Sequence, residues 1–129
     1  MAQVKIYGLR THLEPIKTHL SDAIHQCLIK AFNLPENKRF HRFIALDTSD
    51  FIYPEDRSDK YTILEIIMFE GRSVESKKRL IGLLYERLAS SFGISAQDLE
   101  MVMLESPRHN WGIRGLPGDE LTLNYRVNV

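Results

Sequence analysis

The sequence predicts an α/β fold, a two-layer α+β sandwich in which two tandem β-α-β units form a four-stranded sheet with both helices on one face. One pattern occurs twice, about sixty residues apart, and each copy contains an apolar strand followed by a helical stripe. The two stripes are Leu20, Ile24, Leu28 and Phe32, and Leu80, Leu84, Leu88 and Phe92. Right-handed crossovers place both helices on the same side of the sheet.

The first unit begins with an apolar strand at residues 4–9. From Leu13 the apolar period becomes helical, and Pro15 is expected in the first turn of that helix, where proline is tolerated. Asn33 is expected to end the helix. Residues 40–47 then form the second strand.

The second unit shows the same order more clearly. Residues 61–69 are apolar at almost every position, with Glu65 as the one charge inside the strand. Ser73 is a good N-cap for the helix that follows, and Gly93 is placed to end it in the left-handed conformation. Residues 99–105 are expected to form the fourth strand.

The rest of the chain predicts a loop and an edge strand. Residues 106–119 are too rich in Gly and Pro to be regular, and residues 121–129 alternate well enough for a final edge strand. A strand that is apolar on both faces, such as residues 61–69, is normally covered on both. Because two helices cover one face only, we expect another copy of the chain on the other face.

Length and charge limit the class of protein. The 129 residues suit one domain, spanning 1–129, with its internal repeat at about 1–58 and 59–129. Lys plus Arg equals Asp plus Glu, at 17 each, which argues against nucleic-acid and membrane-surface partners. There is no leader-like start and no apolar run long enough to cross a bilayer, so we expect a cytoplasmic protein.

Common catalytic and metal-binding patterns are missing from the sequence. His19 and His25 share no close helix face, and the other histidines are too scattered to predict a metal site. Cys27 lies on the apolar stripe of the first helix, which predicts a buried, unreactive thiol. No Ser-His-Asp arrangement can be recognised from spacing.

Residues 70–78 carry a family resemblance. Here the expected strand ends in Glu-Gly-Arg-Ser, and the expected helix begins with an acidic residue and lysines. This segment resembles the tautomerase superfamily. The duplicated unit and the tail containing Glu105, Trp111, Arg114, Gly118 and Asp119 look like its malonate semialdehyde decarboxylase branch. The resemblance implies a homotrimer of duplicated β-α-β units that acts without a cofactor or metal.

The resemblance also implies a type of chemistry. In this family an amino-terminal proline acts as general base or acid, and arginines hold the substrate carboxylate beside it. Proton abstraction next to a carbonyl needs a base poised near neutral pH and a cation beside the developing enolate. Here the proline position falls at or near Ala2, and the first proline is Pro15. The candidate base is therefore the terminal amine of Ala2, or of Met1 where that residue is retained.

The resemblance implies a binding site for a small carboxylate made by Arg72, Arg39 and Arg114, with Trp111 as its wall and Asn110 beside it. Each residue also has a plainer interpretation. Arg72 could pair with Glu70 or Glu75 on the surface, and Arg39 could be a solvated charge. Trp111 could be a packing anchor between subunits, and Asn110 a loop-capping residue.

Two positions depart from the branch pattern. Lys38 stands about where the decarboxylase branch has an aspartate, and Glu70 stands where it has a further arginine. Two functions are therefore left open. One is a cofactor-free enzyme that binds a small 2-oxo acid or enol and transfers a proton. The other is a catalytically silent trimer of the same fold, with a binding or structural role.

Overall fold

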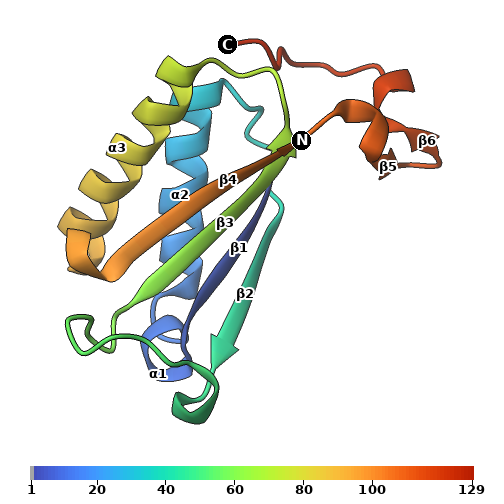
Figure 1. The fold of residues 1–129 in the computed structure, drawn as a ribbon. Coiled ribbons are helices and arrows are strands. Elements are labelled where there is room, and N and C mark those ends of the chain that lie inside the picture. The colour runs from blue at the N-terminus through green and yellow to red at the C-terminus, as the bar shows by residue number, and fades with distance from the viewer. Residues whose placement is uncertain (1) are drawn as a thin grey trace.

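The computed structural model describes residues 2–129 and contains one four-stranded mixed sheet (Figure 1). Its strands are β1 (Ala2–Leu9), β2 (His41–Leu46), β3 (Thr62–Phe69) and β4 (Leu99–Ser106), in the order β2-β1-β3-β4. The pairs β1–β2 and β3–β4 are parallel, and β1–β3 is antiparallel. Each parallel pair is the crossover expected from the repeat.

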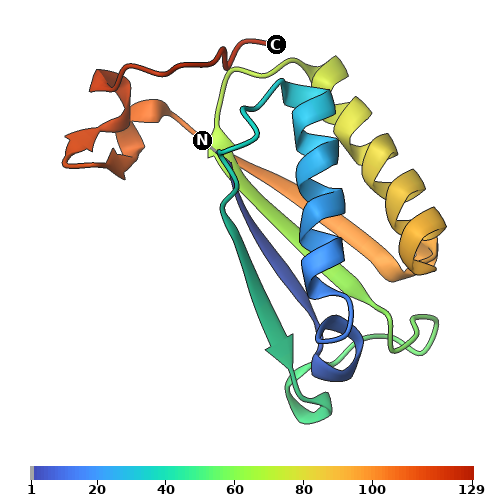
Figure 2. The ribbon, with the colours of Figure 1, turned by 180° about the vertical axis from the view of Figure 1, so that it is seen from behind.

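Two long helices cover one face of the sheet, as Figure 2 shows from behind. They are α2 (Lys17–Phe32) and α3 (Val74–Phe92), and a short helix, α1 (Arg10–Leu13), precedes α2. The predicted fold class is therefore confirmed in its sheet, its helices and its crossovers. No helix among residues 2–129 is both long enough and apolar enough to span a membrane.

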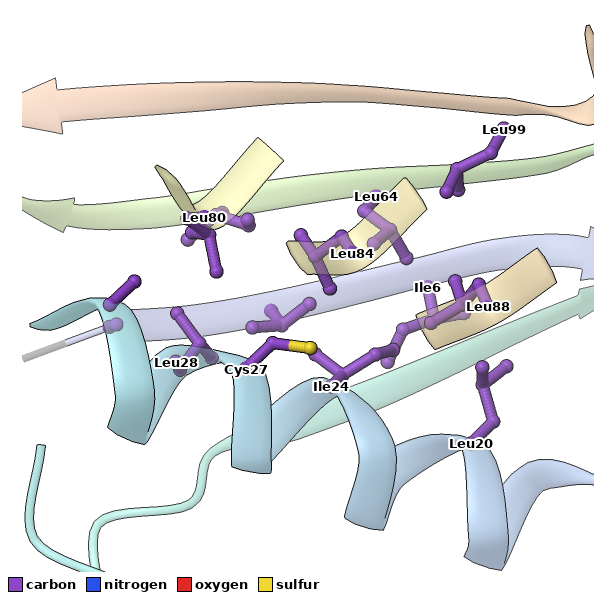
Figure 3. Packing of buried hydrophobic residues seen from close by; sticks show 14 of the residues in the cluster. Ile6, Leu20, Ile24, Cys27, Leu28, Leu64, Leu80, Leu84, Leu88 and Leu99 are labelled. Carbon is purple, nitrogen blue, oxygen red and sulfur yellow. The ribbon is translucent and has the colours of Figure 1, made fainter. Parts of the chain in front are cut away.

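The core lies between the helices and the sheet, and the two predicted stripes supply much of it (Figure 3). Leu20, Ile24 and Leu28 of α2 and Leu80, Leu84 and Leu88 of α3 are all buried. They pack with strand residues such as Ile6 and Leu64. Burying each of these side chains contributes roughly 1.5–3 kcal/mol, so the repeated stripes contribute strongly to stability.

The predicted ends of α3 are confirmed. The Ser73 side chain accepts a hydrogen bond from the Ser76 backbone N–H at 3.1 Å, and Gly93 ends the helix at φ 65°. The long helix of the first unit, α2, begins later than predicted. Pro15 lies in the turn between α1 and α2 and not inside a helix. Its ring removes a backbone donor and clashes with a preceding turn, so α1 stops and α2 starts at Lys17.

The predicted edge strand at residues 121–129 is wrong. This segment has no regular secondary structure and runs past the ends of the strands (Figure 1). The backbone N–H of Ser73 donates to the carbonyl of Val129 at 2.9 Å, and Val127 is buried. Its alternating pattern therefore reflects packing on the core and not a β ladder. The loop before it contains a small hairpin of β5 (Gly112–Ile113) and β6 (Leu116–Pro117).

The sheet face opposite the helices carries apolar side chains, as the sequence predicted. Val102 and Leu104 of β4 are 44% and 45% exposed, and Ile67 of β3 lies beside Leu104 in the register. Glu65, the charged residue inside β3, has a hydrogen-bond partner on the neighbouring strand, because Tyr7 of β1 donates its hydroxyl hydrogen to Glu65 at 2.6 Å. This face is therefore a mixed surface with an apolar side at β3 and β4.

Two histidines are packed between α2 and the start of β2. The Nε2–H of His25 donates to the Glu36 carbonyl at 2.8 Å, and Nδ1 of His41 lies 2.7 Å from the Ser21 hydroxyl. The two rings meet edge to face with centroids 6.0 Å apart. Burial, with smaller effects from His25 and Arg39, lowers the pKa of His41 from 6.5 to about 4.

Acid should therefore destabilise the fold. A histidine whose pKa falls on folding contributes stability that is present above the unfolded pKa, about 6.5, and is lost as the pH falls toward 4. We expect the free energy of unfolding, measured in urea, to fall by about 1–2 kcal/mol between pH 7 and pH 4.5, after discounting for partial solvent access. His41→Phe should flatten this dependence and His19→Phe, at an exposed position, should retain it. Equal slopes for both variants would contradict the assignment.

Candidate functional site

The candidate site lies at the edge of the sheet where β3 and β4 end and β1 begins (Figure 1). Ala2 pairs with Met68 near the end of β3, and the N–H of Glu70 donates to the Ser106 carbonyl at 3.1 Å, just after both strands stop. Segment 121–129 crosses the same edge. The start of the chain, the Gly-Arg-Ser segment and the carboxyl-terminal segment thus meet at one place.

Gly71 sets the path of the chain after β3. It has φ 124°, a conformation that side chains strongly disfavour, and a Cβ built there would stand 2.6 Å from Oδ1 of Asn128. The sharp turn carries the next residue, Arg72, inward, and Ser73 then caps α3. A glycine is needed here both for the backbone angle and for the close approach of Asn128.

Arg72 is buried, with 4% of its surface exposed. Its Nη1 donates to the carbonyl of Phe69 at 3.3 Å, and its guanidinium carbon lies 4.7 Å from the centroid of the Phe32 ring. Within the described chain, its Nε and Nη2 have no hydrogen-bond partner. Burial lowers the pKa of Arg72, and nearby Tyr125 and Glu105 partly oppose the shift.

The plainer interpretation of Arg72 is therefore wrong. No ion pair joins Arg72 to a carboxylate among residues 2–129, and Glu70 and Glu75 are both exposed. Glu105, the nearest acidic influence on Arg72, instead pairs with Lys77. A buried cation with two free donors is costly unless something completes its bonding, and such groups concentrate at functional sites.

A cavity of about 260 Å³ opens at the same edge. Its lining residues are Lys38, Arg114, Leu121, Thr122, Leu123, Asn124 and Tyr125. Arg114 adopts φ 50°, the left-handed region, at the turn of the β5–β6 hairpin. Lys38 and Arg114 make the cavity positive, which suits an anionic ligand.

Tyr125 lines this cavity and belongs to the carboxyl-terminal segment that reaches the turn before Arg72. It is half-buried, and it packs against the core. Burial raises the pKa of Tyr125, while the guanidinium groups of Arg72, Arg108 and Arg114 act to lower it. The positive charges of all three arginines act on the phenol, whose raised pKa keeps it protonated at neutral pH.

Trp111 packs its own loop against the end of β3. Its ring meets Phe69 edge to face at 5.1 Å between centroids, and its carbonyl accepts a hydrogen bond from the Gly118 N–H at 2.7 Å. Nδ2 of Asn110 donates to the Ser106 hydroxyl at 3.0 Å, as expected of a loop-capping residue. Within one copy of the chain, neither residue lines the cavity.

The other predicted site residues lie in different places, some at the site edge and one on the surface away from it. Arg39 lies on the surface and pairs with Asp22 at 2.5 Å, which lowers the pKa of Asp22. It could reach a ligand only by leaving that partner. Ala2 is buried in β1 at the site edge, and Met1 lies outside the described residues. The structure therefore brings Arg72, Arg114 and Ala2 to one edge and leaves Arg39 in a separate pair.

Sequence reasoning missed Tyr125 and Arg108. Tyr125 lies in the segment that was expected to be a strand, where no local signal pointed to a cavity. Arg108 donates from Nε and Nη2 to the carbonyl of Gly118 at 3.2 and 3.1 Å, and from Nη2 to that of Leu121 at 3.1 Å. It thereby ties the loop to the segment that forms the cavity wall. No group of three or more possible metal-binding side chains occurs within residues 2–129.

Arg72 and Arg108 should respond differently to the same substitution. Arg72→Met removes one long hydrogen bond and a cation–π contact but also relieves a buried, incompletely bonded charge, so the free energy of unfolding should change by less than about 1 kcal/mol or rise. Arg108→Met removes three well-formed hydrogen bonds and should lower it by about 1–3 kcal/mol. Urea unfolding of both variants tests this. A larger loss for Arg72→Met would make that residue structural.

Comparison with known proteins agrees with this architecture. A family model described as "Tautomerase enzyme" matches residues 38–114, more than half of the chain. The probable tautomerase YusQ of Bacillus subtilis is 26% identical over 97 residues, covering 71% of this chain and 76% of that protein. The 2-hydroxymuconate tautomerase of Comamonas testosteroni is 35% identical over 57 residues, covering 44% of this chain and 90% of that protein.

Solved structures show the same fold. Malonate semialdehyde decarboxylase superposes with a TM-score of 0.79 at 22% identity, covering 92% of this chain and 99% of that chain. Native fused 4-OT has a TM-score of 0.80 at 20% identity, covering 92% and 98%. The two parallel β-α-β units and the match of the family model together show that the chain belongs to the tautomerase superfamily.

Proposed function

We propose that this protein binds a small 2-oxo acid or its enol and catalyses proton transfer between the two forms without a cofactor, as a keto–enol tautomerase. The observation that carries the proposal is the buried guanidinium of Arg72, whose Nε and Nη2 have no partner within the described chain. These two nitrogens form one edge of the guanidinium plane. That edge donates two parallel hydrogen bonds and matches the two oxygens of a carboxylate.

The third nitrogen fixes the direction of this edge. Nη1 donates to the Phe69 carbonyl, and the guanidinium stacks near the Phe32 ring. The orientation is therefore set before a ligand arrives, and little side-chain entropy is lost on binding. A preorganised cation in a site that excludes water also stabilises the charge of an enolate far better than a solvated one does.

The relatives support an enol carboxylate as the substrate class. The similar proteins named above include a probable tautomerase and a 2-hydroxymuconate tautomerase, whose name specifies an enol acid. The malonate semialdehyde decarboxylase structure supports the fold and leaves the reaction of this chain open. Lys38, which lines the cavity, adds positive charge at a place where the resemblance implied an aspartate. The chemistry that fits best is therefore proton transfer at the carbon next to the carbonyl of a 2-oxo acid.

We propose the terminal amine at the start of β1 as the base. Pairing of Ala2 with Met68 brings the start of the chain to the end of β3, two residues before the Gly-Arg-Ser segment. An α-amino group has a pKa of about 7.7–8.0, so a useful fraction is free base at neutral pH. The kcat/KM should then rise through an ionisation near pH 8.

Ketonisation of phenylenolpyruvate, followed by absorbance, tests the function. The wild type should exceed the buffer rate by at least about 100-fold. Arg72→Met should lower kcat/KM by about 100-fold, because the carboxylate loses its paired donors and the enolate its cation.

Arg87→Met is the matched control, since Arg87 makes hydrogen bonds to Gln26 and Ser91 on the helical side of the molecule. It should leave the rate unchanged. Arg39→Met tests whether that arginine contributes despite its pair with Asp22. If neither the wild type nor any variant exceeds buffer, tautomerase activity is refuted, and a catalytically silent binding or structural member of the fold takes its place.

We also propose that the bare sheet face, centred on Ile67, Val102 and Leu104, is closed by other copies of the chain in a homotrimer. Structures of similar fold include trimers of fused 4-OT. Light scattering at micromolar concentration should give three times the chain mass. Leu104→Lys should shift the protein toward monomer, whereas Ile81→Lys, at a 37% exposed position on α3, should not. A monomeric wild type would disprove the trimer.

A further inference from the structure

We propose that Tyr125 is a catalytic residue that contacts the substrate, and that segment 121–125 forms the wall that seats the substrate against Arg72. This inference rests on the proposed function and adds to it a residue that neither the family resemblance nor the sequence pattern identified. The hydroxyl of Tyr125 would donate a hydrogen bond to the oxygen on the carbon next to the carboxylate. That oxygen carries the negative charge of the enolate.

The first support is that one segment of the chain forms most of the cavity wall. Five of its seven lining residues come from segment 121–125, and the other two are Lys38 and Arg114. The region matched by the family model ends at residue 114. The wall is therefore built by a part of the chain beyond that match. A segment in this position can adapt the pocket of one protein without changing its shared fold.

The second support is that this segment is held firmly at both ends. At the first residue of the wall, Arg108 donates to the Leu121 carbonyl. After the wall, Val127 is 9% exposed and the carbonyl of Val129 accepts from the Ser73 N–H at 2.9 Å. The Gly71 position admits Asn128 at a distance that leaves no room for a Cβ. Anchors on both sides fix the position of Tyr125 well enough for directed hydrogen bonding.

The third support is the position of Tyr125 between the buried arginine and the cavity. The segments that carry the two residues are in contact, because the Ser73 N–H donates to the Val129 carbonyl and Val127 lies 3.4 Å from a Cβ built at Gly71. The mutual effect of Arg72 and Tyr125 on their pKa values agrees with this placement. Arg72 itself does not line the cavity. In the proposed pose, a ligand that enters the cavity and places its carboxylate on Arg72 lies alongside the phenol of Tyr125.

The chemistry requires no proton from the phenol. During ketonisation the enol O–H bond breaks and its proton goes to the base, while a C–H bond forms at the adjacent carbon with a proton delivered by the base. The Tyr125 proton stays on its oxygen and stabilises the charge on the substrate oxygen between these two events. Atoms and charge balance without a further reactant.

Tyr125→Phe tests the proposal, because it keeps the ring that packs on the core and removes only the hydroxyl. With phenylenolpyruvate we expect kcat to fall about 10- to 100-fold, with KM changed by less than about 3-fold. Tyr85→Phe is the matched control, since its hydroxyl donates to the Leu99 carbonyl at 2.9 Å beneath α3. That variant should keep wild-type kinetics although it also loses a hydrogen bond.

The outcomes separate this inference from the proposed function. If Tyr125→Phe retains wild-type kcat while Arg72→Met is impaired, Tyr125 is not catalytic and the proposed function stands. If the wild type is no faster than buffer, the proposed function fails and this inference fails with it.

A second measurement covers the case in which Tyr125→Phe does not fold. Incorporation of 3-fluorotyrosine at position 125 keeps both ring and hydroxyl, and its fluorine resonance should shift on titration with phenylpyruvate. The shift should disappear in Arg72→Met. A resonance that does not move while phenylpyruvate binds, as measured by calorimetry, would overturn the inference.

Discussion

The antiparallel pairing of β1 with β3 is the constraint on which the site depends. Each parallel β-α-β unit could bury its own helix stripe, but only this central pairing joins the two units into one sheet. Because the pairing is antiparallel, the start of one unit lies beside the end of the leading strand of the other. Ala2 is thereby placed next to Met68, and the turn at Gly71 delivers Arg72 to the same edge.

The energetics of this edge differ from those of the core. In the core, apolar side chains are buried and complete their contacts within the chain. At the edge, Arg72 is equally buried yet keeps two donors unused within the described chain, and the lining of the cavity at this edge includes the cations Lys38 and Arg114. Natural proteins retain such incompletely bonded groups mainly where function needs them, since a hydrophobic residue of similar size would be at least as stable. The contrast between core and edge is therefore itself a functional signal.

Local signals in the sequence predicted the local features well. The two leucine-rich stripes, the Ser73 cap and the Gly93 terminus all depend on neighbours within a few residues, and all are confirmed. The sequence failed where the outcome depended on distant contacts. The alternation of residues 121–129 arises because Val127 and Tyr125 pack on the core. An alternating pattern alone does not distinguish such a segment from a strand. The burial of Arg72 likewise depends on Phe32 and on segment 121–129, and neither lies near it in sequence.

The edge-to-face contact of Trp111 with Phe69 gives the molecule a built-in optical reporter. Trp111 is the single tryptophan of the chain, and its indole nitrogen is buried without a partner in the part of the chain described. Its emission therefore reports on one place, where the loop after β4 rests on the last residue of β3. Any rearrangement that lifts this loop exposes the indole to water and shifts its emission to longer wavelength. Motion at the site edge can thus be followed by spectroscopy on the unlabelled protein.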